Sequence, residues 1–585
     1  MNIPTCLRGF AAIAWFTVFP LAASAASRSP DAATDPAIKL PDLQVTTSAG
    51  LPPPESWRYA RVGDFEVLSN ASDRTTRSLL ADFAKFTRAM SLVWPLPLKP
   101  LASSTLILCG GRGQFDAFPP DGALNNEAIV PSLLLRNREQ IAIVVDVESR
   151  RLSAVPTNLQ DINAESADYE VDHYRQLYRE YLRYLLSQNQ VRPPAWLEEG
   201  LAQIIMDIEL DDRTLIYGKI DTFKGAAVGD GPQTEDDPTP PADAVVGEQP
   251  LNVVLQHRRL IPFDRFFATT ADSPEARNPL GNNLWAKQAY AFVHFCMFGG
   301  NLRYQKALGM FVDRLAHEPL SEGLFQDCFK TSYGKMAKEL RGYILHTRHK
   351  YQQYNLVEGD RFSAKTIALR EATTAEVGLL KGDALRLGGH LDTAYAAYRS
   401  AYLRGSREPA LLAGMGVTEN SLNHPDRARE LLEAAVKAGT KLPSAYVGLA
   451  RLRLEQAIAN PAAEGKLSVA QMGAVLSLLF EARKSQPPLP ETYELIASAW
   501  ARSSVPPKIA NLGVLDEGIR FFPRDSALLY AAAQLYREAG ENTAAASIAR
   551  LGLRFSPDAD TKARFEKLLV LIPVSADKPA EPVDK

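Results

Sequence analysis

Cysteine, histidine and long apolar runs are all scarce in this chain, and each shortage excludes a class of protein. Four cysteines among 585 residues are too few for a disulfide-stabilised scaffold. Eight histidines occur, and no two stand four residues apart, so the H-x-x-x-H spacing with which one helix binds zinc is missing. After the first 25 residues, no run of about twenty apolar residues offers an integral membrane segment. A net charge of −3 excludes bulk attraction to nucleic acid or an anionic membrane.

The composition is otherwise that of a folded protein of several domains. Hydrophobic residues make up 46% and charged residues 23% of the chain, which are typical values for globular proteins. At about 150 residues per domain, this length predicts three or four structural units. No feature of the sequence indicates an oligomeric state.

The N-terminus has the pattern of a cleaved signal peptide. Arg8 provides the positive charge, Phe10–Leu21 is an apolar run too short to span a bilayer, and Ala23-Ser24-Ala25 is a signal-peptidase cleavage pattern. We therefore predict a signal peptide over residues 1–25, with cleavage near Ala25, and a periplasmic or secreted mature protein. Cys109, Cys296 and Cys328 remain after cleavage and allow at most one disulfide within the chain; the sequence does not decide whether any pair forms.

Mixed patterning follows, which predicts an α+β domain over residues 57–351. A linker rich in Ala, Ser, Thr and Pro precedes it at 26–56. Strands are expected at 65–68, 105–109 and 140–147, and helices at 76–92, 170–188, 194–208 and 283–298. Strands that are followed by a run of helices are typical of the α+β class. Residues 225–250, which contain Asp-Asp-Pro-Thr-Pro-Pro, are predicted to form a mobile surface loop.

Prolines near the C-terminus recur with a period that indicates helical repeats. Pro409 and Pro443 are 34 residues apart, as are Pro523 and Pro557, and Pro490 precedes Pro523 by 33. Pro443 and Pro490 are 47 apart, and we place much of the 13-residue excess within 460–468. A helix-turn-helix unit of 34 residues is the tetratricopeptide (TPR) signature.

Small residues fall where paired helices of such repeats approach closely, at Gly382, Ala394, Ala401, Gly414, Ala428 and Ala435. The alternative is an irregular helical bundle whose prolines recur by chance. We expect an all-α TPR-like superhelical array over 375–572, with a disordered tail at 573–585.

Two neighbouring stretches carry the most specific motif. Tyr178-Arg179-Glu180-Tyr181-Leu182-Arg183 is followed by Trp196-Leu197-Glu198-Glu199-Gly200-Leu201-Ala202. Here the chain resembles the gluzincin metallopeptidases of the peptidase MA-like type, in which H-E-Y-x-H on one helix precedes W-L-x-E-G-L-A on the next. The resemblance covers roughly residues 57–350 and implies a zincin-like domain.

The resemblance also implies roles for four positions. In the family, two histidines one helical turn apart bind zinc, the adjacent glutamate is the general base, and a glutamate of the next helix completes the ligands. These positions are Arg179, Arg183, Glu180 and Glu199. Arginine stays protonated and offers no lone pair to a metal, so Arg179, Arg183 and Glu199 are vestigial metal positions and Glu180 is a vestigial general base.

Two interpretations of these four residues remain open at this point. They are either an ordinary charged helix face or an internal cluster, in which Glu199 pairs with an arginine. For function, we expect an exported, catalytically inactive peptidase relative without a cofactor, which binds a protein or peptide through the concave surface of the array. The alternative is an exported peptidase or other hydrolase that uses Glu180 or Glu199 with unrecognised or absent metal ligands.

Overall fold

The computed structural model describes residues 56–93, 103–120, 132–147, 151–154, 167–170, 173–187, 192–211, 213–220, 255, 258–277, 281, 283–345, 349–355, 367–461 and 465–573. The predicted signal peptide, the loop 225–250 and almost all of the predicted linker and tail lie outside these residues. No helix within the described residues is long and apolar enough to cross a membrane.

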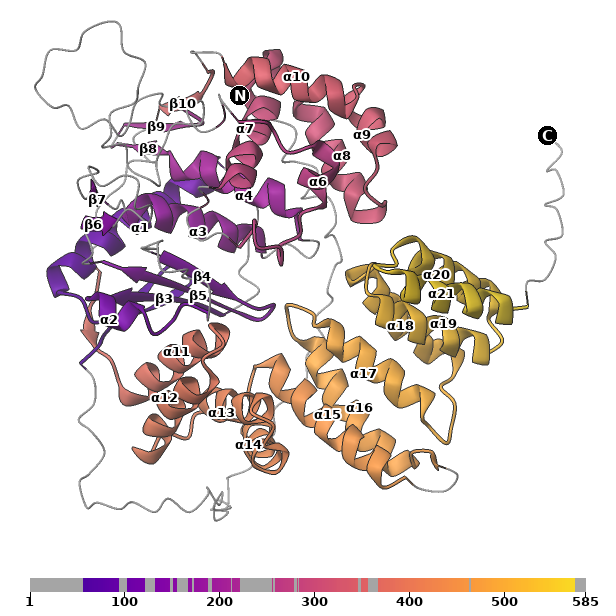
Figure 1. Ribbon diagram of the computed structural model, residues 1–585. Coiled ribbons are helices and arrows are strands. Elements are labelled where there is room, and N and C mark those ends of the chain that lie inside the picture. Colours follow the sequence, from indigo (N-terminus) through magenta and orange to yellow (C-terminus); the bar gives the residue numbers. More distant parts are fainter. Residues whose placement is uncertain are drawn as a thin grey trace, which may run out of the picture.

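A six-stranded mixed sheet forms the centre of the N-terminal region (Figure 1). Its strand order is β11-β1-β2-β3-β5-β4, with β2, β3 and β5 parallel and the other strands antiparallel to their neighbours. The three predicted strands correspond to β2, β3 and β5, whereas β1, β4 and β11 were not predicted. The strands are β1 (Arg58–Val62), β2 (Phe65–Ser69), β3 (Ser103–Cys109), β4 (Ser132–Arg136), β5 (Gln140–Asp146) and β11 (Arg370–Glu371).

Both faces of this sheet are buried, each by a different part of the chain. Leu106 and Leu108 of β3 pack into a core shared with α1 (Asp73–Val93) and α3 (His173–Ser187). Ile107, between them, packs into a second core with Leu380 and Leu385 of α11 (Thr374–Leu387). Side chains alternate between the faces of a strand, so the apolar run of β3 serves both cores. The first helix of the C-terminal array is thus also a layer of the N-terminal domain (Figure 1).

Helices after α3 complete the first core. Two of them, α4 and α7, are buried on nearly all sides and pack against each other. Gly200 of α4 permits this approach, because a Cβ there would lie 2.5 Å from Val293 Cγ2 and 2.6 Å from the carbonyl oxygen of Ala289. The remaining N-terminal elements are α2 (Arg112–Phe115), β6 (Arg151–Ala154), β7 (Ala167–Glu170), α4 (Ala195–Met206), β8 (Glu209–Leu210), β9 (Thr214–Tyr217), α6 (Phe263–Ala268), α7 (Leu284–Phe298), η2 (Gly300–Leu302), α8 (Gln305–His317), α9 (Glu322–Phe329), α10 (Tyr333–Ile344) and β10 (Gln352–Asn355).

The C-terminal region is an array of helix pairs with a final single helix (Figure 1). Its first helices, which are α11, α13, α15, α17, α19 and α21, contact one another in succession, while the second helices of neighbouring pairs make fewer such contacts. In a curved stack the more closely spaced layer lies on the inside, so the first helices form the inner layer of the array. The helices after α11 are α12 (Leu391–Leu403), α13 (Pro409–Ser421), α14 (Pro425–Lys437), α15 (Pro443–Ala459), α16 (Val469–Lys484), α17 (Pro490–Ala501), α18 (Ile509–Phe521), α19 (Ser526–Glu538), α20 (Asn542–Arg554) and α21 (Ala559–Leu571).

Glycine and proline act at the predicted positions in these repeats. A Cβ at Gly382 would lie 2.5 Å from the ring of Tyr398, and one at Gly414 would lie 2.8 Å from the same ring. Pro409, Pro443 and Pro490 occupy the first turn of α13, α15 and α17, where the missing N–H costs no helical hydrogen bond.

The long third repeat differs in part from the prediction. Both of its helices are lengthened, with 17 residues in α15 and 16 in α16, compared with 13 in each of α13 and α14. The loop 460–468 therefore holds only a part of the insertion.

Candidate functional site

The four residues singled out by the motif meet at the contact between α3 and α4. Arg179, Glu180 and Arg183 lie on α3, and Glu199 lies on α4. The relative exposure of Arg179, Glu180 and Glu199 is only 0%, 1% and 3%. They are therefore not an ordinary solvated helix face.

Arg179 is at the centre of the cluster. Its Nε and Nη2 donate to the two carboxylate oxygens of Glu199 at 3.2 and 2.8 Å, and its Nη1 donates to Glu180 Oε1 at 2.6 Å. Arg183 Nη1 donates to the other oxygen of Glu180 at 3.1 Å. The predicted pairing of Glu199 with an arginine is confirmed, and Glu180 is paired with arginine as well. The two-pronged contact with Glu199 matches the planar geometry of both groups.

A third glutamate and a third arginine, for which no role was predicted, extend the cluster. Glu198 Oε1 accepts from Arg136 Nη2 at 2.5 Å and from Arg183 Nε at 3.2 Å. Arg136 Nη1 also donates to the carbonyl oxygen of Arg183 at 3.2 Å. Arg136 ends β4, which was not predicted as a strand. The signal that would have indicated a hairpin is the apolar run Leu133–Leu135, followed by the polar residues 136–139 and then by the apolar strand β5.

Gln203, supported by Gly281 and Lys287, holds the carboxylate of Glu199 from its other side. Gln203 Nε2 donates to Glu199 Oε1 at 2.8 Å and to the carbonyl oxygen of Gly281 at 2.6 Å. Lys287 Nζ donates to Gln203 Oε1 at 3.1 Å. Gly281 has a φ of +61°, and a Cβ there would lie 2.4 Å from Glu199 Oε1. Glycine is thus required at 281 by both backbone conformation and space.

The charges of the cluster balance, because Arg136, Arg179 and Arg183 face three glutamates. Burial acts to raise the pKa of Glu198, but Arg136, Arg183 and the rim residue Arg192 outweigh it and lower that pKa to about 2. For Glu199 burial is again outweighed, here mainly by Arg179, and its pKa lies below the usual range. Burial lowers the pKa of Arg136 to about 10, so this guanidinium stays charged at neutral pH.

These donors do not fit a zinc ion. Arginine nitrogens have no lone pair to give, and the carboxylate oxygens of Glu180 and Glu199 already accept guanidinium hydrogen bonds. Within the described residues, no group of three or more His, Cys, Asp or Glu side chains is arranged to hold a metal ion. The cluster can hold α3, α4 and β4 together, and the lowered pKa values make the carboxylates of Glu198 and Glu199 poor proton acceptors.

Other reactive side chains are buried away from this cluster. Cys109, Cys296 and Cys328 are buried thiols; burial raises the pKa of Cys109 to about 12, which suppresses the nucleophilic thiolate. His294 accepts from the Tyr343 hydroxyl through Nδ1 at 2.7 Å and donates from Nε2 to the Gly218 carbonyl at 2.6 Å. Burial lowers its pKa to about 3, so the ring is a neutral core residue.

The same hairpin that supplies Arg136 also contacts the array. In the turn between β4 and β5, Glu139 Oε2 accepts from the backbone N–H of Ser444 at the start of α15, at 2.9 Å. The guanidinium of Arg138 lies 4.8 Å from the ring centre of Phe522, which follows α18. Gln140 Nε2 donates to Asp383 of α11 at 2.8 Å. One β-turn thus touches repeats that are far apart in sequence.

The far end of the array contacts the N-terminal domain again. Arg524, in the turn before α19, donates to the carbonyl oxygen of Leu315 near the C-terminus of α8. Arg554 Nη2 lies 4.0 Å from Glu318 Oε2. Cations are favoured at the C-terminal end of a helix. The array is therefore attached to the domain through α11, through the β4–β5 turn and through its last pair.

Comparison with known proteins finds similarity to TPR proteins of known structure. No family model matches the chain, and no curated protein matches it. Among solved structures, the TPR protein YrrB, whose description mentions an unusual peptide-binding site, is 18% identical and covers 32% of this chain and 90% of its own, with a TM-score of 0.24. The TPR protein TTC0263 of Thermus thermophilus is 19% identical over 33% of this chain and 97% of its own, with a TM-score of 0.23.

Yeast Tom70 covers more of the chain at lower identity. It is 12% identical over 51% of this chain and 61% of its own length, with a TM-score of 0.26. The C-terminal region is thus similar to TPR proteins, and the repeat assignment itself rests on the packing described above. These comparisons give no support to a gluzincin fold.

Proposed function

We propose that this is an exported protein that binds a protein or peptide partner through its TPR-like array, and that its N-terminal domain is a gluzincin relative without zinc chemistry. The observation that carries the binding role is the inner layer formed by the six first helices, α11, α13, α15, α17, α19 and α21. They form a curved surface of the kind that binds extended segments, and the N-terminal domain covers part of it.

The cluster supports the loss of metal chemistry. Arg179 and Arg183 stand where the motif has its two histidines, and together they carry the formal charge of one zinc ion. They pair with Glu180 and Glu199, the positions of the general base and the third ligand. A fixed pair of guanidinium groups therefore compensates these glutamates without a metal.

The alternative is a hydrolase that uses Glu180 or Glu199. A general base must reach the proton that it removes and must have a pKa near the working pH. Glu180 and Glu199 are 1% and 3% exposed, and the arginines lower the pKa of Glu199. Both properties favour a structural role for the two carboxylates.

Site-specific cross-linking in the native compartment tests the binding role. A photoreactive amino acid replaces either Arg451, an exposed residue of α15 close to Glu494 on the inner layer, or Glu433, on the outer helix α14. We expect defined adducts from position 451 and none from position 433. Equal labelling from both positions, or none from either, would contradict the proposal.

A peptidase assay on a general substrate tests the alternative. We expect the wild type and Glu180→Gln to show the same background rate. An activity that disappears in Glu180→Gln would instead favour the hydrolase.

A further inference from the structure

Much of the inner surface of the array is not open to a partner, because the N-terminal domain covers it. Leu380 and Leu385 of α11 are buried against the sheet. The β4–β5 turn contacts the N-terminal end of α15 through Glu139, and Arg138 lies against Phe522 between α18 and α19. The helices α19 and α21 lie beyond these contacts, and the contact of Arg524 with α8 involves the turn before α19.

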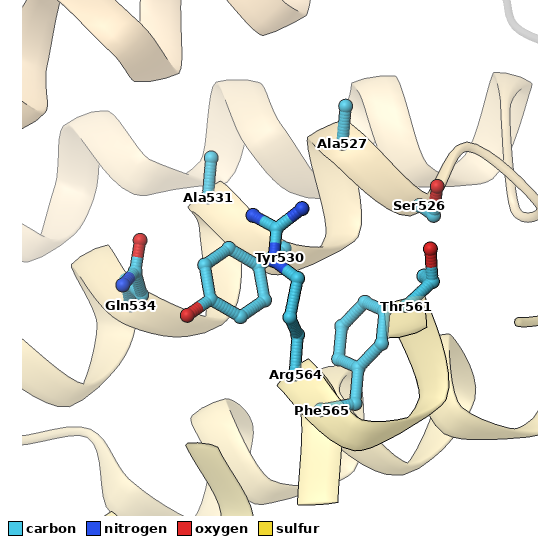
Figure 2. Close-up of a pocket in the computed structure, with 8 residues that line it drawn as sticks. All are labelled: Ser526, Ala527, Tyr530, Ala531, Gln534, Thr561, Arg564 and Phe565. Atoms are coloured by element: carbon cyan, nitrogen blue, oxygen red, sulfur yellow. The ribbon is translucent and has the colours of Figure 1, made fainter. Parts of the chain in front are cut away.

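A pocket lies in this remaining part, between α19 and α21 (Figure 2). Its volume is about 290 Å³, near the lower end of the range for ligand pockets, so it suits a short stretch of chain. The pocket uses the face of α19 opposite Leu528, Leu529, Ala532 and Ala533, which form its buried face. The residues that line it are Ser526, Ala527, Tyr530, Ala531, Gln534, Thr561, Arg564 and Phe565.

The lining of this pocket carries a positive charge and no negative charge. Arg564 is its single ionised side chain, and none of the eight lining residues is acidic. The guanidinium carbon of Arg564 lies 4.5 Å from the ring centre of Tyr530, which holds the cation over the pocket (Figure 2). Ala527, Ala531 and the ring of Phe565 provide apolar surface beside it.

Asp558, a carboxylate that interacts electrostatically with Arg564, is already engaged in hydrogen bonds. Asp558 accepts from the backbone N–H of Thr561 at 2.7 Å and from its hydroxyl at 3.0 Å, so it caps α21. Arg564 has no hydrogen bond or ion pair with any described residue. Its guanidinium therefore has donors available for an anion, and carboxylate is the anion that proteins present in extended segments.

We propose that this pocket binds an acidic peptide segment of the partner, with a glutamate or aspartate carboxylate on Arg564 and an adjacent apolar side chain against Phe565. The inference rests on the proposed binding function and adds a contact site on α19 and α21 to the part of the inner layer that position 451 of α15 tests. Tyr530 and Gln534 add a hydroxyl and an amide that can form hydrogen bonds with the peptide backbone. The charge of Arg564 therefore provides specificity for an acidic side chain, and the surrounding polar and apolar surface contributes to affinity.

Two peptides and three variants test this proposal. The probes are fluorescently labelled nine-residue peptides with alternating Glu and Leu, or with Gln in place of each Glu, and fluorescence anisotropy reports their binding to the full chain. Arg564→Gln removes the cation, Arg564→Lys retains it, and Lys562→Gln makes the same charge change at an exposed site of α21 outside the lining.

We expect the Glu peptide to bind more tightly than the Gln peptide. Arg564→Gln should weaken its binding roughly tenfold or more, as expected for a lost charge-assisted hydrogen bond, while Lys562→Gln changes it less than about twofold. Arg564→Lys should bind between the wild type and Arg564→Gln.

Each other outcome overturns the proposal. Equal binding of both peptides would remove the charge specificity. Equal losses in Arg564→Gln and Lys562→Gln would reduce it to general electrostatics, and the absence of binding by either peptide would exclude this ligand class. None of these results affects the cross-linking test at position 451, so failure of the pocket and failure of the binding function are distinguishable.

Discussion

Removal of the Glu199 carboxylate is the perturbation for which the structure gives the clearest magnitude. Glu199 accepts two hydrogen bonds from Arg179 and one from Gln203, all at 3.2 Å or less, and it is 3% exposed. In Glu199→Ala the fully buried Arg179 retains Glu180 as a partner but loses its two-pronged contact. Breaking a buried pair from one side costs about 3 to 5 kcal/mol, because a charge is left without compensation.

A matched control separates burial from charge. Glu433 pairs with Arg453 at 3.1 Å, but their side chains are 47% and 33% exposed. Glu433→Ala should lower the free energy of unfolding by less than about 1 kcal/mol. Urea denaturation of the full chain, followed by circular dichroism, measures both variants.

The double variant Arg179→Met/Glu199→Leu completes the test. Replacing both partners with apolar side chains leaves neither charge unpaired, so this variant should be more stable than Glu199→Ala. A Glu199→Ala variant within 1 kcal/mol of the wild type, or a double variant less stable than it, would refute the reasoning.

Two further predictions concern the array. Gly382→Ala should destabilise the fold by about 1 to 3 kcal/mol, because its Cβ would lie 2.5 Å from the Tyr398 ring. Gly473→Ala in α16, where nothing lies within 4 Å, should instead stabilise the fold by about 0.4 to 1 kcal/mol. Equal effects of the two variants in urea denaturation would contradict the packing argument. Burial and a hydrogen bond with Asp525 raise the pKa of Glu494 from 4.5 to about 7. The folded state therefore binds this proton more tightly than the unfolded state does. The stability that the bound proton contributes is fully present below pH 4.5 and is lost as the pH rises through about 7. Glu494→Gln should therefore gain stability relative to the wild type between pH 5 and pH 8 in thermal melts; a difference that is constant with pH would exclude this titration.

Local patterns allowed much of the fold to be predicted. The strands at 65–68, 105–109 and 140–147 and the helix at 283–298 were recognisable, because apolar runs and periodicity are local properties. The repeat period was visible for the same reason, since prolines at the first turn and glycines against Tyr398 recur in sequence.

Features that depend on contacts distant in sequence were missed. Arg136 joins the cluster from a strand that the pattern did not indicate, and it meets Glu198 across 62 positions. The use of α11 as a layer of the sheet could not be predicted, because Leu380 has the same amphipathic spacing whether it meets a helix or a sheet. The N-terminal domain and the array therefore share a core, although the sequence divides them near residues 351–375.

Zinc binding by the Arg179→His/Arg183→His variant tests the central claim most directly. The double substitution removes two positive charges beside Glu180 and Glu199 and provides two imidazole ligands one helical turn apart. Elemental analysis after dialysis against zinc should find about one zinc ion per chain in this variant and none in the wild type. Zinc retained by the wild type, or absent from a folded double variant, would contradict the account of a metal position occupied by an arginine and glutamate cluster.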